Sequence, residues 1–252
     1  MRWLTPGELA ALGFQRSRVV MMNEAHDGLR RSVRTRKVGR SVLPAAHASG
    51  VRHLAMEALY PHFAEEGNRT RRLPEAGQGY LSQPEMRAFM QDALDLGWTL
   101  VAYEADSRLW LDDHIPAIAP EKAAAALLSM PFTNWREEEQ PRNLVAALKR
   151  LPPEGRMLVW CGNGHHGKSP VSDWVPMGHH FIGQTGLDPF VIDQNRTVRF
   201  EPEDPKTELE SRYRGELSAR GGTAGFLAAE RPEPLAEETA DAFILSTDNE
   251  LE

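Results

Sequence analysis

The chain has 252 residues, of which 41% are hydrophobic and 26% are charged, proportions that are ordinary for a globular protein. It contains no run of about 18 apolar residues, which excludes a membrane-spanning helix, and its single cysteine, Cys161, excludes an intrachain disulfide. The net charge of −7 argues against general nucleic-acid binding, and Met1–Glu8 lacks the apolar core of a signal peptide, so we expect a cytoplasmic protein.

Short apolar runs alternate along the chain with stretches of helical spacing. The apolar runs predict strands at residues 18–23, 52–57, 99–104, 156–161, 189–193 and 241–246. Helical spacing predicts helices at residues 29–48, 84–96 and 137–150. This alternation predicts an α/β fold with a mostly parallel central sheet, helices on both faces and an active-site crevice at the carboxyl ends of the strands.

The pattern contains no internal repeat and no domain linker, so we expect a single α/β domain over residues 1–252. Two segments are predicted to be irregular. Residues 65–83 are rich in Gly, Arg and Pro, which predicts a lid or a flexible insertion. Residues 201–234 are acidic and rich in Pro and Gly, so we expect a loop-rich segment that wraps around the body before the final strand.

Polar side chains stand at the ends of several predicted strands, where the crevice is expected. Glu24 and His26 follow the first strand, Glu57 ends the second and Glu104 ends the third. The strand at residues 156–161 leads into a Gly-flanked loop that contains His165. A general base requires an imidazole beside a carboxylate, because the carboxylate orients the ring and stabilises its charged form. The sequence therefore predicts acid–base chemistry at this edge of the sheet.

The order of these motifs resembles that of the erythromycin esterase-like and ChaN-like superfamily. Asn23–Asp27 resembles the G-E-x-H block that opens the pattern, and Gly50–Glu57 resembles the second strand, which ends in a functional Glu. Arg136–Asn143 is similar to the R-E-x-x-M-x-x-N helix, with its Arg and Asn at the same separation. Met157–His165 resembles the strand that ends in H-N-x-H, and Trp174–Gly178 resembles the M-G turn that follows.

Two positions depart from the family pattern. Asn23 stands where the first block has Gly, and Gly162 stands where H-N-x-H has its first His. The second departure argues against an esterase mechanism that uses two histidines of that motif. Gly-Asn-Gly-His is closer to the ChaN-like side of the superfamily, whose members include haem-binding proteins.

The resemblance implies a hydrolase that acts on an ester, a lactone or a related small substrate, with a metal-independent mechanism favoured. In this interpretation His26 is the general base that activates water, and Glu24 and Glu57 orient the base or the water. Arg136 and His165 would stabilise the developing oxyanion. A lyase or cyclase that uses the same base stays open.

Two cofactors are alternatives to the metal-independent interpretation. A divalent metal such as zinc or iron would make the protein a metal-dependent hydrolase or lyase, and its predicted ligands are Glu24, His26, Glu57 and His165. Haem binding is the non-enzymatic alternative, with axial ligands from Met177, His179 and His180, or from His165 and His166.

A phosphate loop is a third alternative, because Gly162–Ser169 matches G-x-x-x-x-G-K-S and follows a predicted strand. Such a loop needs a helix that begins at its Lys, here Lys168. Pro170 and Pro176 disfavour a long helix after Ser169, which argues against nucleotide hydrolysis. Lys168 is still expected to bind an anion.

The predicted partner is a small-molecule substrate, with no nucleic acid and no membrane, and homo-oligomerisation stays open. The basic run at residues 30–40 is typical of a solvated helix face. In a sharper interpretation, Arg30 or Arg34 faces the crevice and attracts an anionic substrate. The other residues expected to contact the substrate are Glu104, Asn143, Asn163, His166 and Lys168.

Overall fold

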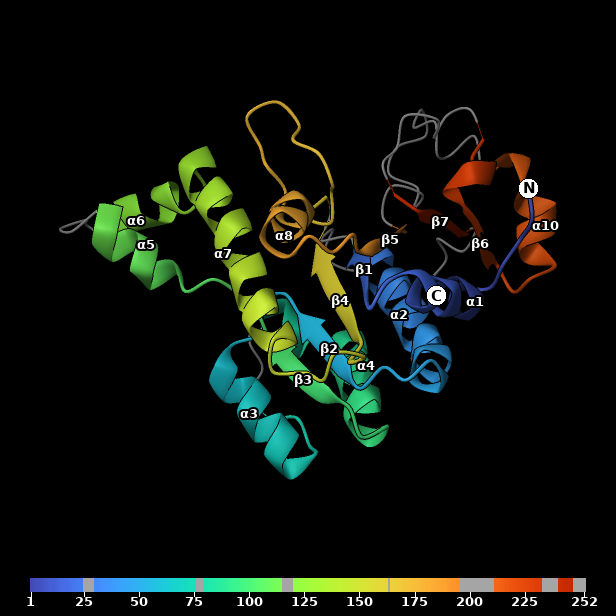
Figure 1. Cartoon of the computed structure of the whole chain (residues 1–252), viewed down its shortest axis with the longest axis horizontal. Coiled ribbons are helices and arrows are strands. Elements are labelled where there is room, and N and C mark those ends of the chain that lie inside the picture. The colour runs from blue at the N-terminus through green and yellow to red at the C-terminus, as the bar shows by residue number, and fades with distance from the viewer. Residues whose placement is uncertain are drawn as a thin grey trace.

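A computed structural model of the chain describes residues 1–24, 30–75, 79–114, 120–162, 164–194, 211–232 and 240–246. Its elements are built on a seven-stranded sheet with the order β3-β2-β4-β1-β5-β7-β6 (Figure 1). The strands are β1 (Val19–Glu24), β2 (His53–Met56), β3 (Thr99–Ala102), β4 (Met157–Gly162), β5 (Phe190–Asp193), β6 (Thr223–Leu227) and β7 (Ala242–Ser246). All neighbouring pairs are parallel except β6 and β7. The predicted α/β fold with a mostly parallel sheet is therefore confirmed.

Helices cover both faces of this sheet. They are α1 (Pro6–Arg16), α2 (Arg30–Ala48), α3 (Pro61–Thr70), α4 (Pro84–Asp95), α5 (Ser107–His114), α6 (Pro120–Ala126), α7 (Met130–Leu148), α8 (Met177–Thr185) and α10 (Arg214–Ser218), with short 3₁₀ turns at Gly79–Ser82 and Ala228–Glu230. In Figure 1, α7 crosses in front of the sheet, and α5 and α6 lie beyond one of its ends. Within the described ranges, none of the helices combines the length and the apolar character that crossing a bilayer requires.

The hydrophobic core lies in two layers because side chains alternate across each strand. In β1, Val20 and Met22 pack into the layer formed with α1, α2 and α4. Val19 and Met21 pack into the opposite layer, formed with α7, α8 and α10. Every residue of β1 is buried, as expected of a central parallel strand that has helices on both faces.

Helix α7 begins at Met130, seven residues before the predicted start. Ser129 precedes it, and its side chain accepts the backbone N–H of Phe132, while Pro131 occupies the first turn, where a missing N–H costs nothing. Pro141 lies inside the same helix. The longer helix matters for function because its middle residues face the carboxyl ends of β2 and β3.

The two segments predicted to be irregular contain regular structure. Helix α3 continues to Thr70 because Ala64 and Gly67 are buried along one of its faces, and a 3₁₀ turn follows at Gly79–Ser82. Helix α10 and strand β6 lie in the described part of the segment 201–234, at residues 211–232. Strand β6 forms because it pairs with β7 along five residues.

Candidate active site

Glu57 lies at the carboxyl end of β2, beside the end of the neighbouring strand β4. Its backbone N–H donates to the Trp160 carbonyl over 3.1 Å, which continues the pairing of the two strands for one more residue. The Gly162 N–H in turn donates to Oε2 of Glu57. The Glu57 side chain is 5% exposed, so these backbone contacts fix a carboxylate in a nearly water-free position.

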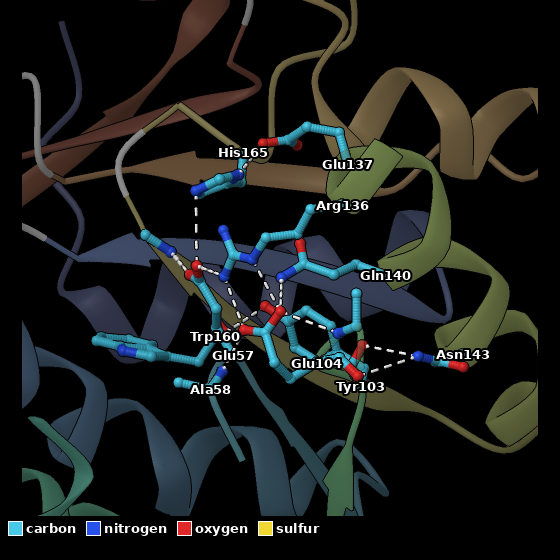
Figure 2. Close-up of polar contacts among 12 residues, drawn as sticks. Glu57, Ala58, Tyr103, Glu104, Arg136, Glu137, Gln140, Asn143, Trp160 and His165 are labelled. Atoms are coloured by element: carbon cyan, nitrogen blue, oxygen red, sulfur yellow. Dashed lines mark hydrogen bonds and ion pairs between the residues drawn. The ribbon is translucent and has the colours of Figure 1, made fainter. Parts of the chain in front are cut away.

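Arg136 reaches this carboxylate from the middle of α7. Its Nη2 lies 2.5 Å from Oε1 of Glu57 and 2.7 Å from Oε2 of Glu104, and its Nε lies 2.8 Å from Oε1 of Glu104 (Figure 2). Gln140, one helical turn further along, donates to the same Glu104 oxygen over 2.9 Å. Burial lowers the pKa of Arg136, but the hydrogen bonds and charges of Glu104 and Glu57 outweigh it and raise that pKa. The guanidinium therefore stays charged and joins two strand ends.

His165 lies between two carboxylates. Its Nε2 is 3.5 Å from Oε1 of Glu57, and its Nδ1 contacts Oε1 of Glu137 (Figure 2). Glu137 is fully buried, and its other oxygen accepts the backbone N–H of Met177 over 2.5 Å. Burial alone lowers the pKa of His165, but the charge of Glu57 and the hydrogen bond to Glu137 outweigh it, so the pKa is raised. The two carboxylates therefore stabilise the charged imidazolium form of the ring.

A second buried polar group lies at the ends of β1 and β5. Nε of Arg36, from α2, lies 2.7 Å from Oε2 of Glu24, and both side chains are at most 1% exposed. Nearby, Asn23 donates to Asp193 over 2.9 Å, and Nε2 of His166 lies 3.8 Å from the same carboxylate. The interpretation of the basic run as a solvated face is thus wrong at Arg36, because Glu24 offers it a buried partner.

The structure places the predicted site residues in different surroundings. Glu57, Glu104, Arg136 and His165 form one network, and Asn143 adjoins it by donating to the carbonyls of Tyr103 and Glu104 over 3.2 Å. The other described candidates bond elsewhere: Arg34 donates to the Gly222 carbonyl, and Lys168 pairs with Asp188 and Asp241. His26, Asn163 and the side chain of Arg30 lie outside the described residues, so their roles stay predictions.

Five residues of the two groups were not among the predicted site residues: Asn23, Arg36, Glu137, Gln140 and Asp193. Glu137 and Gln140 lie one and four positions after Arg136, so both share the part of α7 that faces the strand ends. That spacing could have identified both residues in the sequence, because a helix that presents Arg136 to a site also presents these neighbours. Arg36 carried no such signal, since its partner Glu24 is recognisable only in the folded chain.

The phosphate-loop interpretation of Gly162–Ser169 is wrong. No helix begins at Lys168; the next helix, α8, begins at Met177, after a short bridge between Val171 and Trp174. Nζ of Lys168 lies 2.7 Å from Asp188 and 2.8 Å from Asp241. The lysine is therefore engaged by two carboxylates of its own chain.

Most of the predicted cofactor ligands lie among the described residues. Among the residues that the structure describes, no group of three His, Cys, Asp or Glu side chains is arranged to hold a metal ion, and His26 lies outside them. Met177 is fully buried in the hydrophobic core, and the ring nitrogens of His165 face two carboxylates. Haem ligation by these residues stays a prediction.

Comparisons with known proteins concern the fold. No family model and no curated protein matches the sequence. Over 95% of its length the chain is similar to the solved structure "Cofacial heme binding to ChaN of Campylobacter jejuni", covering 91% of that chain with a TM-score of 0.56 and 8% identity. Toxin structures also match, among them RRSP, a MARTX toxin effector domain from Vibrio vulnificus (TM-score 0.46, 16% identity, 76% of this chain). The chain spans about a third of the length of these toxin chains, 36%. The likeness to ChaN establishes a ChaN-like fold.

Proposed function

We propose that the chain is a hydrolase-like enzyme that activates water against an ester, a lactone or a related small substrate. The observation that carries this proposal is the placement of His165 between Glu57 and Glu137, beside Arg136, at the carboxyl ends of β2 and β4. Active sites of open α/β sheets form at this edge. The ChaN-like fold is compatible with the erythromycin esterase-like motifs on which the hydrolase assignment rests.

His165 is suited to donate a proton. Glu57 and Glu137 favour the imidazolium, and the buried Glu137 fixes the direction of the ring by its contact with Nδ1. A histidine whose one nitrogen is held by a carboxylate presents its other nitrogen in a defined direction, as in acid–base triads. The Nε2 of His165 is therefore the atom that we assign to proton donation.

The proposed reaction divides proton transfer between two histidines. The oxygen of a water molecule forms a bond to the carbonyl carbon of the substrate while His26 takes a proton from that water. The bond between this carbon and the leaving oxygen then breaks, and the leaving oxygen takes the proton from Nε2 of His165. Arg136 keeps Glu57 and Glu104 in place, and we assign its positive charge to stabilising the negative charge that develops on the substrate.

The test is hydrolysis of a panel of nitrophenyl esters and small lactones by the purified full chain. We expect His26→Ala and His165→Gln each to lower turnover by roughly 10²–10⁴, the usual contribution of a general acid or base. His179→Gln is the matched control, because this exposed histidine lies on α8 outside the network, and it should leave turnover unchanged.

Two results would overturn the proposal. One is turnover by the His26→Ala or His165→Gln variant at the rate of the unmodified chain. The other is a folded protein that hydrolyses no member of the panel faster than buffer does. Elemental analysis of the same preparation tests the metal-dependent alternative, since a stoichiometric metal that is lost together with His26 would make that histidine a ligand.

A further inference from the structure

A hollow of about 570 Å³ borders the network of Glu57, Arg136 and His165 at Glu104. Three segments surround it: the start of α3, the turn from β3 into α5, and the middle of α7. We call it the Trp135 hollow, and the lining residues that matter here are Tyr60, His62, Glu104, Asp106, Trp135 and Glu139. A substrate bound at Glu57 and Arg136 therefore has this space beside it.

Aromatic rings form part of its wall. Trp135 stacks on Phe132 with ring centroids 5.8 Å apart, and Phe132 packs edge-on against Trp110 at 5.3 Å. These ring contacts support the indole of Trp135. The rings of Tyr60 and His62, which also line the hollow, stack nearly parallel, with an interplanar angle of 11° and centroids 6.3 Å apart. Tyr60 is 43% exposed, which leaves part of this apolar residue in contact with solvent. The π-faces of Trp135 and Tyr60 are negative and attract cations.

Carboxylates supply the rest of the polar lining. Glu104, Asp106 and Glu139 line the hollow, and Arg108 is the one cation among the described lining residues. Arg108 is bound to Asp106 over 2.6 Å, and its side chain is 83% exposed, so water screens much of its charge.

The guanidinium groups of Arg136 and Arg142, which contact these carboxylates from outside the hollow, do not neutralise them fully. Arg136 is shared between Glu104 and Glu57. Arg142 is shared between Glu139 and Glu138 in the same way. Three carboxylates and one guanidinium therefore line the hollow, and each guanidinium outside it is divided between a lining carboxylate and another one, so the lining keeps an excess of negative charge.

We propose that the Trp135 hollow binds an organic cation, an alkylammonium or alkylguanidinium group, carried by the substrate of the site at His165. The assignment to a substrate rests on the proposed function, whereas the binding of a cation rests on the hollow itself. An organic cation gains both from the aromatic walls and from Asp106 and Glu139, while a hydrated metal ion gains little from the rings. Arg30 and Arg34 predicted an anionic substrate, whereas this inference predicts a substrate that carries a positive charge.

Calorimetric titration of the full chain with n-butylguanidinium tests the inference, with n-butylurea as a neutral probe of the same shape. We expect the guanidinium to bind about tenfold more tightly or better, and its affinity to fall as salt is added. Trp135→Leu and Glu139→Gln should each weaken its binding by about threefold or more, since each removes one contributor to cation binding. Glu66→Gln, on the exposed face of α3, is the matched control and should bind as the unmodified chain does.

Equal affinity for the two probes would overturn the inference, and so would unchanged guanidinium affinity in both the Trp135→Leu and Glu139→Gln variants. Titration of His165→Gln separates this outcome from failure of the proposed function. That variant should bind the guanidinium normally, because His165 does not line the hollow. Cation binding by a chain that hydrolyses no ester or lactone contradicts only the proposed function. Hydrolysis by a chain that does not prefer the cation contradicts only the inference about the hollow.

Discussion

Arg136 holds Glu57 through a 2.5 Å contact between Nη2 and Oε1, although the two residues lie 79 positions apart in the chain. The same guanidinium holds Glu104, which follows the neighbouring strand β3. One side chain of α7 thus ties the carboxyl ends of two parallel strands together. The network is therefore structural as well as chemical, and its variants must be judged by stability and turnover together.

Arg136→Gln should destabilise the chain by about 3 kcal/mol, because it leaves Glu57 and Glu104 nearly buried without their cation. Arg142→Gln is the matched control on the same helix. Arg142 also touches two carboxylates, but it is 53% exposed, so its loss should cost about 1 kcal/mol or less. Urea unfolding of both variants measures the difference. Equal losses would mean that Arg136 contributes no more than a surface ion pair.

The raised pKa of His165 predicts a stability that depends on pH. The folded chain keeps a proton on His165 at pH values where the unfolded chain has lost it. The resulting stabilisation is fully present below the ordinary histidine pKa of about 6.5 and is lost as pH rises through the folded-state pKa. Unfolding free energies of the unmodified chain and of His165→Gln, measured from acid to alkaline pH, should therefore differ most at low pH. A difference that is constant or that grows with pH would contradict the assignment.

The order of strand ends explains why part of the site was predictable. Glu57, Glu104 and His165 each follow an apolar run, and the carboxyl ends of parallel strands meet at one edge, so proximity followed from position alone. Arg36 could not be predicted in this way. It lies in a basic run, and only the folded chain brings Glu24 to within 2.7 Å of it.

The strands of the sheet also differ in how well the sequence predicts them. Strands such as β4 are predictable because their sequence is continuously apolar. Strand β6, in contrast, contains Gly225, and glycine weakens strands. The structure supplies the reason for that glycine, since a Cβ there would lie 2.3 Å from the Phe243 carbonyl and 2.4 Å from Leu9. Strand β7 and helix α1 approach β6 closely at Gly225, and a single sequence does not reveal this close approach.

Cys161 should be inert to iodoacetamide while the chain is folded. It is buried in β4, and burial raises its pKa, as do the charges of Glu57 and Glu137, so no reactive thiolate forms. Its thiol donates to the Met22 carbonyl over 3.5 Å. Labelling should begin only at urea concentrations that unfold the chain, whereas Ser169→Cys in a Cys161→Ala background, at an exposed position, should be labelled at once. Rapid labelling of the folded chain at Cys161 would show that β4 opens locally.

Gly178 and Gly183 offer a matched pair on α8 for testing how the His165 loop is held. The Gly178 N–H donates to the His165 carbonyl over 2.8 Å, and a Cβ at this position would lie 2.4 Å from the backbone oxygen of His166. Gly178→Ala must therefore displace the loop, and we expect a loss of about 1–3 kcal/mol in stability together with a fall in turnover. A Cβ at Gly183 meets nothing within 4 Å, so Gly183→Ala should stabilise the helix by about 0.5–1 kcal/mol and leave turnover unchanged. If Gly178→Ala kept full stability and turnover, the contact between α8 and the loop would not be what positions His165.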